Sequence, residues 1–295
     1  MKPGFHPQIT AREYFAEPCP TPALTCSTIK ALAYRTAKEA AFEHGGISPN
    51  SEAVASSAAK RFGDVAHQLA LGKGRGYAIG EYDAWMSKEA KQFKADAESA
   101  GLTPIKRKDY ERATLSAEIM SNKIHDTLAL LHGDTGEVPD FDTEVVFTWV
   151  EITPSGPIWC RGMADVWCPS LGVILDPKFS PVLSDGAFEG HAVKMGWDLQ
   201  DAWYRRGVAA IEPNLAGRIR FINLLVSPRA PFVSRAREAD EATTYSLEPT
   251  IEKAIAKFGA CLKANDWPGY PRVIEPWTAK SYTMTERMMM AEEEA

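Results

Sequence analysis

Cysteines are few in this chain of 295 residues, and none is placed as a zinc site or a disulfide framework would need. There are five, an odd number, widely spread and without any C-x-x-C pair. This pattern argues against disulfide bridges and against structural zinc. We expect Cys160 and Cys168 to line a strand as small apolar residues.

Long apolar runs and nucleotide motifs are also missing. No run approaches the roughly 20 residues that span a bilayer, and the opening M-K-P-G-F-H-P-Q-I-T has no apolar signal core. We therefore expect a cytoplasmic protein with no membrane partner. The chain has no G-x-x-x-x-G-K-[ST] loop, so we expect no ATP-driven motor.

Basic residues are fewer than acidic residues in this chain. With 33 basic and 39 acidic residues, the formal net charge is −6. This is a mild argument against a nucleic-acid partner, because phosphate binding favours basic surfaces. It does not decide the matter, since a local groove can be positive and a bound cation adds charge of its own.

The first half of the chain, about 25–132, is predicted to be helical. The first 25 residues hold several prolines and are expected to be an irregular lead-in. Helical periodicity and capping signals then predict helices over 27–41, 52–71, 83–100 and 108–131. The polarity of the last two indicates helices that face solvent.

The second half, about 140–277, predicts a sheet. Strands are expected at 144–150, 157–168, 172–176, 218–226 and 230–237, and helices at 190–211 and 247–264. The chain shows no internal repeat and no low-complexity linker. We therefore expect one α/β (α+β) domain over 1–283, with a mixed, largely antiparallel sheet flanked by helices. Residues 284–295 are expected to form a disordered tail.

Two aspartates inside apolar strands need an explanation. Asp165 and Asp176 stand in the stretch G-M-A-D-V-W-C-P-S-L-G-V-I-L-D-P-K-F-S, and Lys178 follows the second by two residues. A buried carboxylate is costly unless it is paired, hydrogen-bonded or bound to metal. On neighbouring strands about 4.8 Å apart, the two could converge on divalent cations such as Mg²⁺ or Mn²⁺. A salt bridge with Lys178 is the simpler alternative.

Asp165 followed by Asp176-Pro177-Lys178 resembles the D…(D/E)-x-K core of the PD-(D/E)XK nuclease superfamily. G-D-V-A-H at 63–67 and Q-D-A-W-Y at 200–204 are similar to the G-x-x-x-H and Q-x-x-x-Y motifs of its RecB-like members. C-R-G-M-A-D is similar to their approach to the first aspartate, although Met163 and Ala164 depart from it. T-C-S-T-I-K at 25–30, T-E-V-V-F at 143–147 and N-D-W-P-G-Y at 265–270 are closest to the RecE (exodeoxyribonuclease VIII) type of phage recombination exonuclease.

The resemblance implies a restriction-endonuclease-like core and a metal-dependent 5′→3′ exonuclease. Its substrate would be the ends of linear double-stranded DNA, in phage or prophage recombination in the bacterial or infected-host cytosol. It further implies Mg²⁺ or Mn²⁺, a single-strand annealing protein as partner, and a homo-oligomer. Some relatives hold an iron–sulfur cluster with one early and three late cysteines. Only Cys261 is late here, so we expect no cluster.

The same resemblance assigns roles by position. His67, Asp165, Asp176 and the Pro177 carbonyl would bind metal, with Lys178 and, more weakly, Glu144 completing the catalytic group. Gln200, Tyr204 and Arg161 would contact DNA, or the first two would order the site, since they lie one helical turn apart.

Plainer interpretations stay open. The aspartates could be turn or capping residues, Lys178 a surface ion-pair partner and His67 a core histidine. Proline is unusual inside a strand, so Pro177 requires a bend or an unpaired position. The fold could also belong to a catalytically silent DNA-binding or assembly subunit, or to an endonuclease with the same core.

Overall fold

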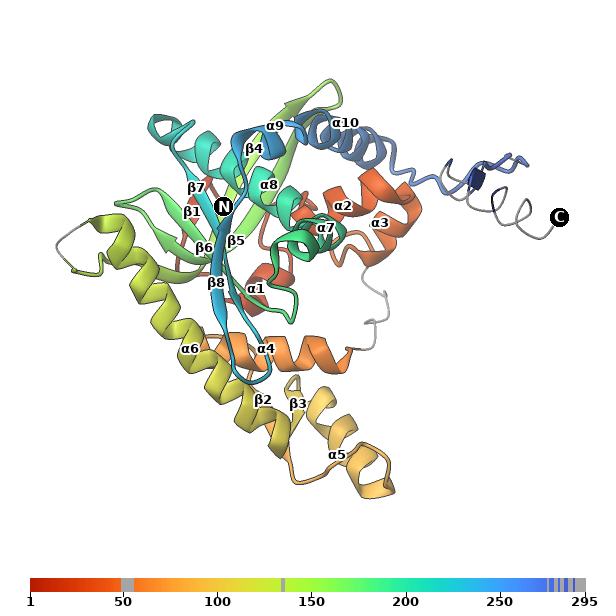
Figure 1. Cartoon of the computed structure of the whole chain (residues 1–295). Coiled ribbons are helices and arrows are strands. Elements are labelled where there is room, and N and C mark those ends of the chain that lie inside the picture. The colour runs from red at the N-terminus through yellow and green to blue at the C-terminus, as the bar shows by residue number, and fades with distance from the viewer. Residues whose placement is uncertain are drawn as a thin grey trace.

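A computed structural model describes residues 1–48, 56–133, 136–274, 276–278, 281, 284, 285 and 289. Its centre is a six-stranded sheet in the order β1-β4-β5-β6-β7-β8 (Figure 1). The strands are β1 (Gly4–His6), β4 (Asp142–Thr153), β5 (Gly156–Cys168), β6 (Val173–Phe179), β7 (Arg220–Val226) and β8 (Ser234–Glu238). Only β6 and β7 pair in parallel, and the other neighbours pair antiparallel. The mixed, largely antiparallel sheet is confirmed.

Helices cover both faces of this sheet. On one face pack α2 (Cys26–Tyr34), α3 (Ala37–Glu43), α8 (Trp197–Ile211) and α10 (Glu248–Ala264), around buried Phe147 and Trp149. The other face is covered by α6 (Arg107–His132) and the end of α4 (Ala58–Leu71). The prediction that 108–131 faces solvent is therefore wrong: Met120, Ile124 and Leu128 of α6 are fully buried against the sheet.

A helical connection joins the two parallel strands. Parallel strands need a crossover rather than a hairpin, and α7 (Asp185–Met195) and α8 supply it. The sequence predicts one helix over 190–211, but the structure has two, because Gly196 adopts φ +76° between them. This left-handed conformation favours glycine and ends α7.

The N-terminal half differs from expectation in three ways. The lead-in holds β1, paired with β4, and α1 (Ala11–Phe15). The helix predicted over 27–41 divides into α2 and α3 at the capping residue Thr36. Before and after α5 (Lys88–Ser99) lie β2 (Tyr77–Gly80) and β3 (Thr103–Lys106), a separate parallel pair. Figure 1 shows this small unit projecting beyond α4 at the end of α6.

The remaining predictions divide between confirmed and untested. The final helix is found as α10, and the short 3-10 turn Pro213–Leu215 and α9 (Glu241–Tyr245) are additional elements. The start of the helix predicted from 52 and most of the tail predicted at 284–295 lie outside the described residues. No helix within the described ranges is long and apolar enough to cross a membrane.

Candidate active site

The site forms where β5 and β6 separate. Their pairing runs from Cys168↔Val173 to Val166↔Leu175 and ends there, while β6 continues beside β7 to Phe179. Asp165 and Asp176 are the next residues on the two strands. Their carboxyl groups are close enough to interact by a hydrogen bond. The predicted convergence of the two aspartates is therefore found.

The same separation explains Pro177. The backbone N–H of Ser180 donates to Val226 on β7, and donors to one neighbour alternate along a strand. The nitrogens of Asp176 and Lys178 therefore face β7, and that of Pro177 faces the opposite side. Pairing with β5 has ended at that point. The proline thus removes no ladder hydrogen bond, although β6 lies inside the sheet.

Helix α4 delivers His67 to this gap. Phe62, Val65 and Ala66 anchor the helix in a small core with Ile105 of β3. His67 Nε2 then lies 3.2 Å from Asp165 Oδ1. Burial disfavours the charged form of both side chains, but the attraction between the two charges outweighs it. The pKa of His67 is raised and that of Asp165 is lowered, which favours an imidazolium–carboxylate pair.

Asp176, Lys178 and Gln200 form a second set of contacts. Lys178 Nζ lies 2.5 Å from Asp176 Oδ2, and donates a hydrogen bond of 3.2 Å to Gln200 Oε1. Gln200 Nε2 donates to Asp176 Oδ1 at 3.0 Å. Asp176 is 1% exposed, and burial raises its pKa to about 7 despite the lysine. Asp176 Oδ2 receives no well-aligned hydrogen bond from the described residues.

Close packing of α8 on β4 positions Gln200 and Tyr204. Any Cβ at Gly207 would lie 2.6 Å from the Trp149 ring, so only glycine permits this approach. Tyr204 is buried, and its hydroxyl accepts a hydrogen bond of 3.4 Å from the Met163 N–H. Of the two roles considered for Tyr204, ordering the site fits this position and contacting DNA does not.

Arg161 is the clearest correction among the candidate site residues. Its guanidinium is buried, pairs with Glu17 at 3.1 Å, donates to the Tyr14 carbonyl and stacks over the Tyr14 ring. Its Nε–H has no partner among the described residues, but it is buried, so the side chain offers no exposed donor to a phosphate. Arg161 instead fastens the N-terminal segment to β5.

Glu144 occupies a strained position next to the aspartates. The register Thr143↔Val166 and Val145↔Ala164 places it directly opposite Asp165. Its φ is +50°, rare for a residue with a side chain, and the residue is 7% exposed. Burial, with Asp165 adding to it, raises the pKa of this carboxyl. Strain of this kind is typical of functional sites.

A cavity of about 510 Å³ opens onto these groups. It is lined by His67, Glu144, Asp165, Pro177 and Lys178, among others. The sequence analysis did not identify Arg75 or Trp197, which also line it. The Trp197 ring lies 5.7 Å from Lys178 Nζ. The glycine-separated cations of G-K-G-R-G at 72–76 were a usable signal for Arg75, whereas Trp197 had none.

The donor set fits a hard divalent cation in chemistry. Three carboxylates, Glu144, Asp165 and Asp176, lie on neighbouring strands, and the buried Asp176 Oδ2 lacks a well-aligned donor. Oxygen atoms of this kind are the ligands that Mg²⁺ prefers. However, in the part of the chain that the structure describes, no three His, Cys, Asp or Glu side chains are already arranged to hold a metal. Binding of a metal ion would require the His67–Asp165 and Lys178–Asp176 contacts to break.

Fold and site together define a mixed α/β protein with a buried acidic–basic cluster at diverging strands. No protein-family model and no curated protein match the sequence. The fold is similar to the crystal structure of a "Putative exonuclease" from Eubacterium rectale, with a TM-score of 0.56 and 14% identity over 94% of this chain and 98% of that one. A solved structure named SSO0001, with 17% identity over 55% of this chain and 69% of that one, reaches a TM-score of only 0.25 and carries no argument.

Proposed function

We propose that the protein is a metal-dependent DNA exonuclease that hydrolyses phosphodiester bonds of linear double-stranded DNA. One observation carries the proposal. His67, Asp165 and Lys178, from two strands and a separate helix, line one cavity on a fold similar to that of the Eubacterium rectale protein, and the buried Asp176 pairs with Lys178. A structural core would not need three carboxylates and an imidazole around a space open to solvent.

Each residue of the site has a proposed role. His67, Asp165, Asp176 and the Pro177 carbonyl would hold Mg²⁺ or Mn²⁺, with Glu144 beside them. The bound ion supplies Lewis-acid chemistry and neutralises charge on the phosphate. Lys178 orients the attacking water and donates to a phosphate oxygen. Gln200 fixes the Lys178 amine and the Asp176 carboxylate relative to each other, because it forms hydrogen bonds with both.

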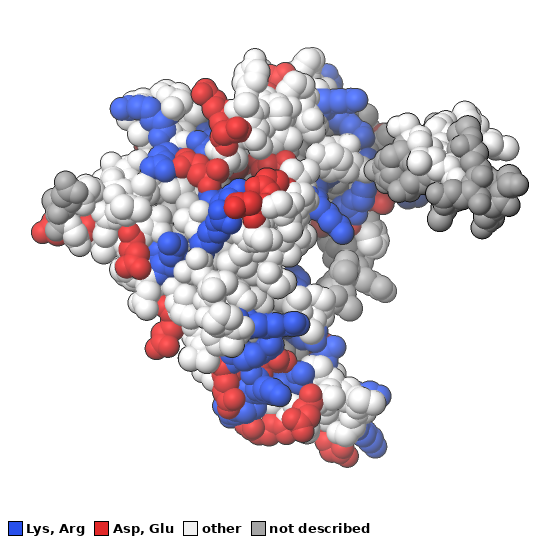
Figure 2. Space-filling model, in the orientation of Figure 1, with Lys and Arg blue, Asp and Glu red and all other residues white. Residues whose placement is uncertain are grey.

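The finer features of the proposal come from the resemblance of the motifs. We infer 5′→3′ digestion in phage recombination, an annealing protein as partner, and a homo-oligomer that encloses the duplex. Figure 2 shows acidic and basic side chains interleaved on the face in view, without one extended basic surface. An oligomer that encloses the duplex would therefore retain the DNA, for which this face of a single chain offers no extended basic surface.

The test is digestion of an end-labelled linear duplex with Mg²⁺. Lys178→Ala should reduce the rate at least about 100-fold, the scale of losing one electrostatic stabiliser of the reaction. Lys108→Ala, an exposed lysine of α6, should digest at the wild-type rate. Normal digestion by Lys178→Ala, with folding verified, would remove the lysine from the mechanism and the proposal with it.

A catalytically silent DNA-binding subunit is the second candidate. It is favoured by the closed ion pairs and by the lack, among the described residues, of a ready metal-ligand set. Duplex that is bound but never cut by the wild type, with Mg²⁺ or Mn²⁺, would select it. A covalently closed plasmid separates the endonuclease alternative, because an end-dependent enzyme leaves the circle intact.

A further inference from the structure

A second hollow lies on the opposite side of α8 from Gln200 and Tyr204. Two cavities, of about 640 and 330 Å³, both touch Glu238 and Ala239. Their walls are α7, α8, the end of β8 and α9. We call the combined space the α8–α9 groove. Trp197 lines both this groove and the candidate active-site cavity, so the two share one wall.

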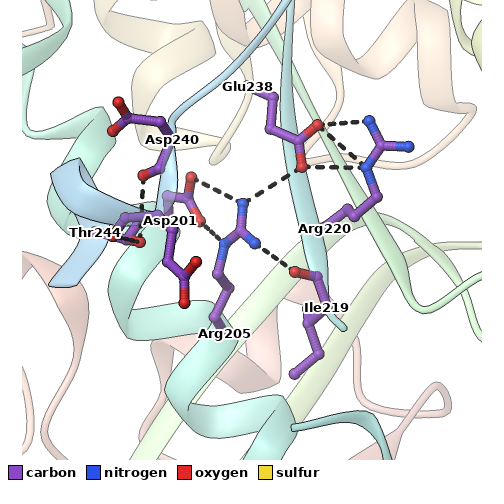
Figure 3. Close-up of polar contacts among 8 residues, drawn as sticks. Asp201, Arg205, Ile219, Arg220, Glu238, Asp240 and Thr244 are labelled. Carbon is purple, nitrogen blue, oxygen red and sulfur yellow. Dashed lines mark hydrogen bonds and ion pairs between the residues drawn. The ribbon is translucent and has the colours of Figure 1, made fainter. Parts of the chain in front are cut away.

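The α8–α9 groove is strongly acidic. Seven acidic and three basic side chains line it, a formal balance of −4. Each arginine is already engaged. Arg205 joins Asp201 to Glu238, which also pairs with Arg220 (Figure 3). The other two arginines of the lining pair with carboxylates as well.

Three acids of the groove keep unbalanced charge. Within the described ranges, no lysine or arginine pairs with Asp198, Asp240 or Glu241. Asp198 accepts from the Leu199 N–H, and Asp240 caps α9 through the Thr243 N–H. These backbone contacts satisfy single oxygens and leave the charges without counterions.

Asn223 gives an independent sign of a missing ligand. It lies on β7 between Phe221 and Leu225, which share its face and pack toward α8 and α7. Asn223 is 6% exposed and lines the smaller cavity. Its Oδ1 is buried and accepts no hydrogen bond from the described residues. A buried amide oxygen in this state needs a hydrogen-bond donor.

The remaining lining narrows the class of ligand. Phe188, Val193 and Tyr245 add apolar surface, and the last two are more than half exposed. Nucleic acid is repelled by the charge. A metal ion is not favoured, because the described residues hold no group of three ligands for one. The chain's own end, 272–295, has three basic and five acidic residues and does not complement the groove.

We propose that the α8–α9 groove binds a basic segment of a protein partner, with a lysine or arginine side chain entering the smaller cavity between Asp198, Asp240 and Asn223. The aliphatic part of such a side chain suits Phe188 and Val193, and its head supplies both the donor and the charge that the cavity lacks. The partner would lie behind α8 and leave the candidate active-site cavity open.

The test uses fluorescence anisotropy with labelled octalysine, and labelled octaglutamate as the reverse-charge probe. Asp198→Asn with Asp240→Asn removes two charges, while asparagine keeps a side-chain oxygen that can accept from the Leu199 and Thr243 N–H groups. The matched control, Asp96→Asn with Glu98→Gln on exposed α5, makes the same charge change elsewhere. We expect the groove variant to weaken octalysine binding about tenfold, or about 1.4 kcal/mol, and the α5 variant to bind as the wild type does.

Asn223→Leu provides the second arm. It should weaken octalysine binding while the urea midpoint stays equal or rises, because the unsatisfied amide is removed. If the groove and α5 variants lost equal octalysine affinity, the effect would come from net charge alone and the proposal would be overturned. Unchanged octalysine binding in both variants would also overturn it. Dissociation of an oligomer by the groove variant would assign the groove to a second copy instead. Duplex digestion should be unaffected throughout, which separates this proposal from the nuclease proposal.

Discussion

Replacing Glu144 with glycine should stabilise the protein relative to alanine at the same position and abolish digestion of DNA. A side chain at left-handed φ costs roughly 1–2 kcal/mol, and Glu144 has φ +50°. In an ordinary strand glycine is instead less stable than alanine by about 0.5–1 kcal/mol. At position 144 we therefore expect Glu144→Gly to exceed Glu144→Ala by about 1 kcal/mol in free energy of unfolding.

The carboxylate and the backbone can be separated with these two variants. Both variants lose the buried carboxylate that faces Asp165, so both should fail to digest linear duplex. They differ only in the free-energy cost of the left-handed backbone conformation. Ile152, exposed on the same strand β4 and not at positive φ, is the control. There Ile152→Gly should be less stable than Ile152→Ala. Urea unfolding measures all four variants. If Glu144→Gly proved no more stable than Glu144→Ala, the strain argument would be refuted, and normal digestion by both would remove Glu144 from the site.

Two further substitutions test the neighbouring contacts. Gln200→Leu deletes hydrogen bonds to Asp176 and Lys178, and we expect a lower turnover rate with little change in duplex affinity. A loss of affinity alone would make Gln200 a DNA contact rather than a positioning residue. Arg161→Met leaves the buried Glu17 with only His44 Nε2, at 3.5 Å, and should cost about 3 kcal/mol in urea unfolding. Stability near that of the wild type, with weaker DNA binding, would return Arg161 to the DNA-contact role.

Local patterns were sufficient for the core of the site and of the sheet. Asp165, Asp176 and Lys178 could be located because strands of alternating and apolar residues are recognisable over short windows. The break between α2 and α3 was also readable. Thr36 and Glu39 form a capping box whose T-x-x-E signature stands in the sequence.

Other features depend on contacts that no short window contains. The role of Arg161 follows from Glu17 and Tyr14, which lie far from it in sequence and reach it only through the folded N-terminal segment. Strand β1 has three residues and exists because β4 offers it an edge. The strain at Glu144 is a backbone property that the residue type argues against. Such features require the fold first, and then the local conformation can be understood.

The position of Pro177 connects strand divergence with tolerance of a proline, and this link can be tested. Since the nitrogen of Pro177 faces the side where β5 has already left β6, Pro177→Ala should lose only the stiffening of the unfolded chain, about 0.4–1 kcal/mol. Leu175→Pro, two residues earlier, removes a donor on the same side where β5 still pairs and should cost about 3 kcal/mol or more. Comparable losses at both positions in urea unfolding would mean that β5 and β6 do not separate at Asp176, and the opening that admits His67 and Lys178 to the aspartates would need another origin.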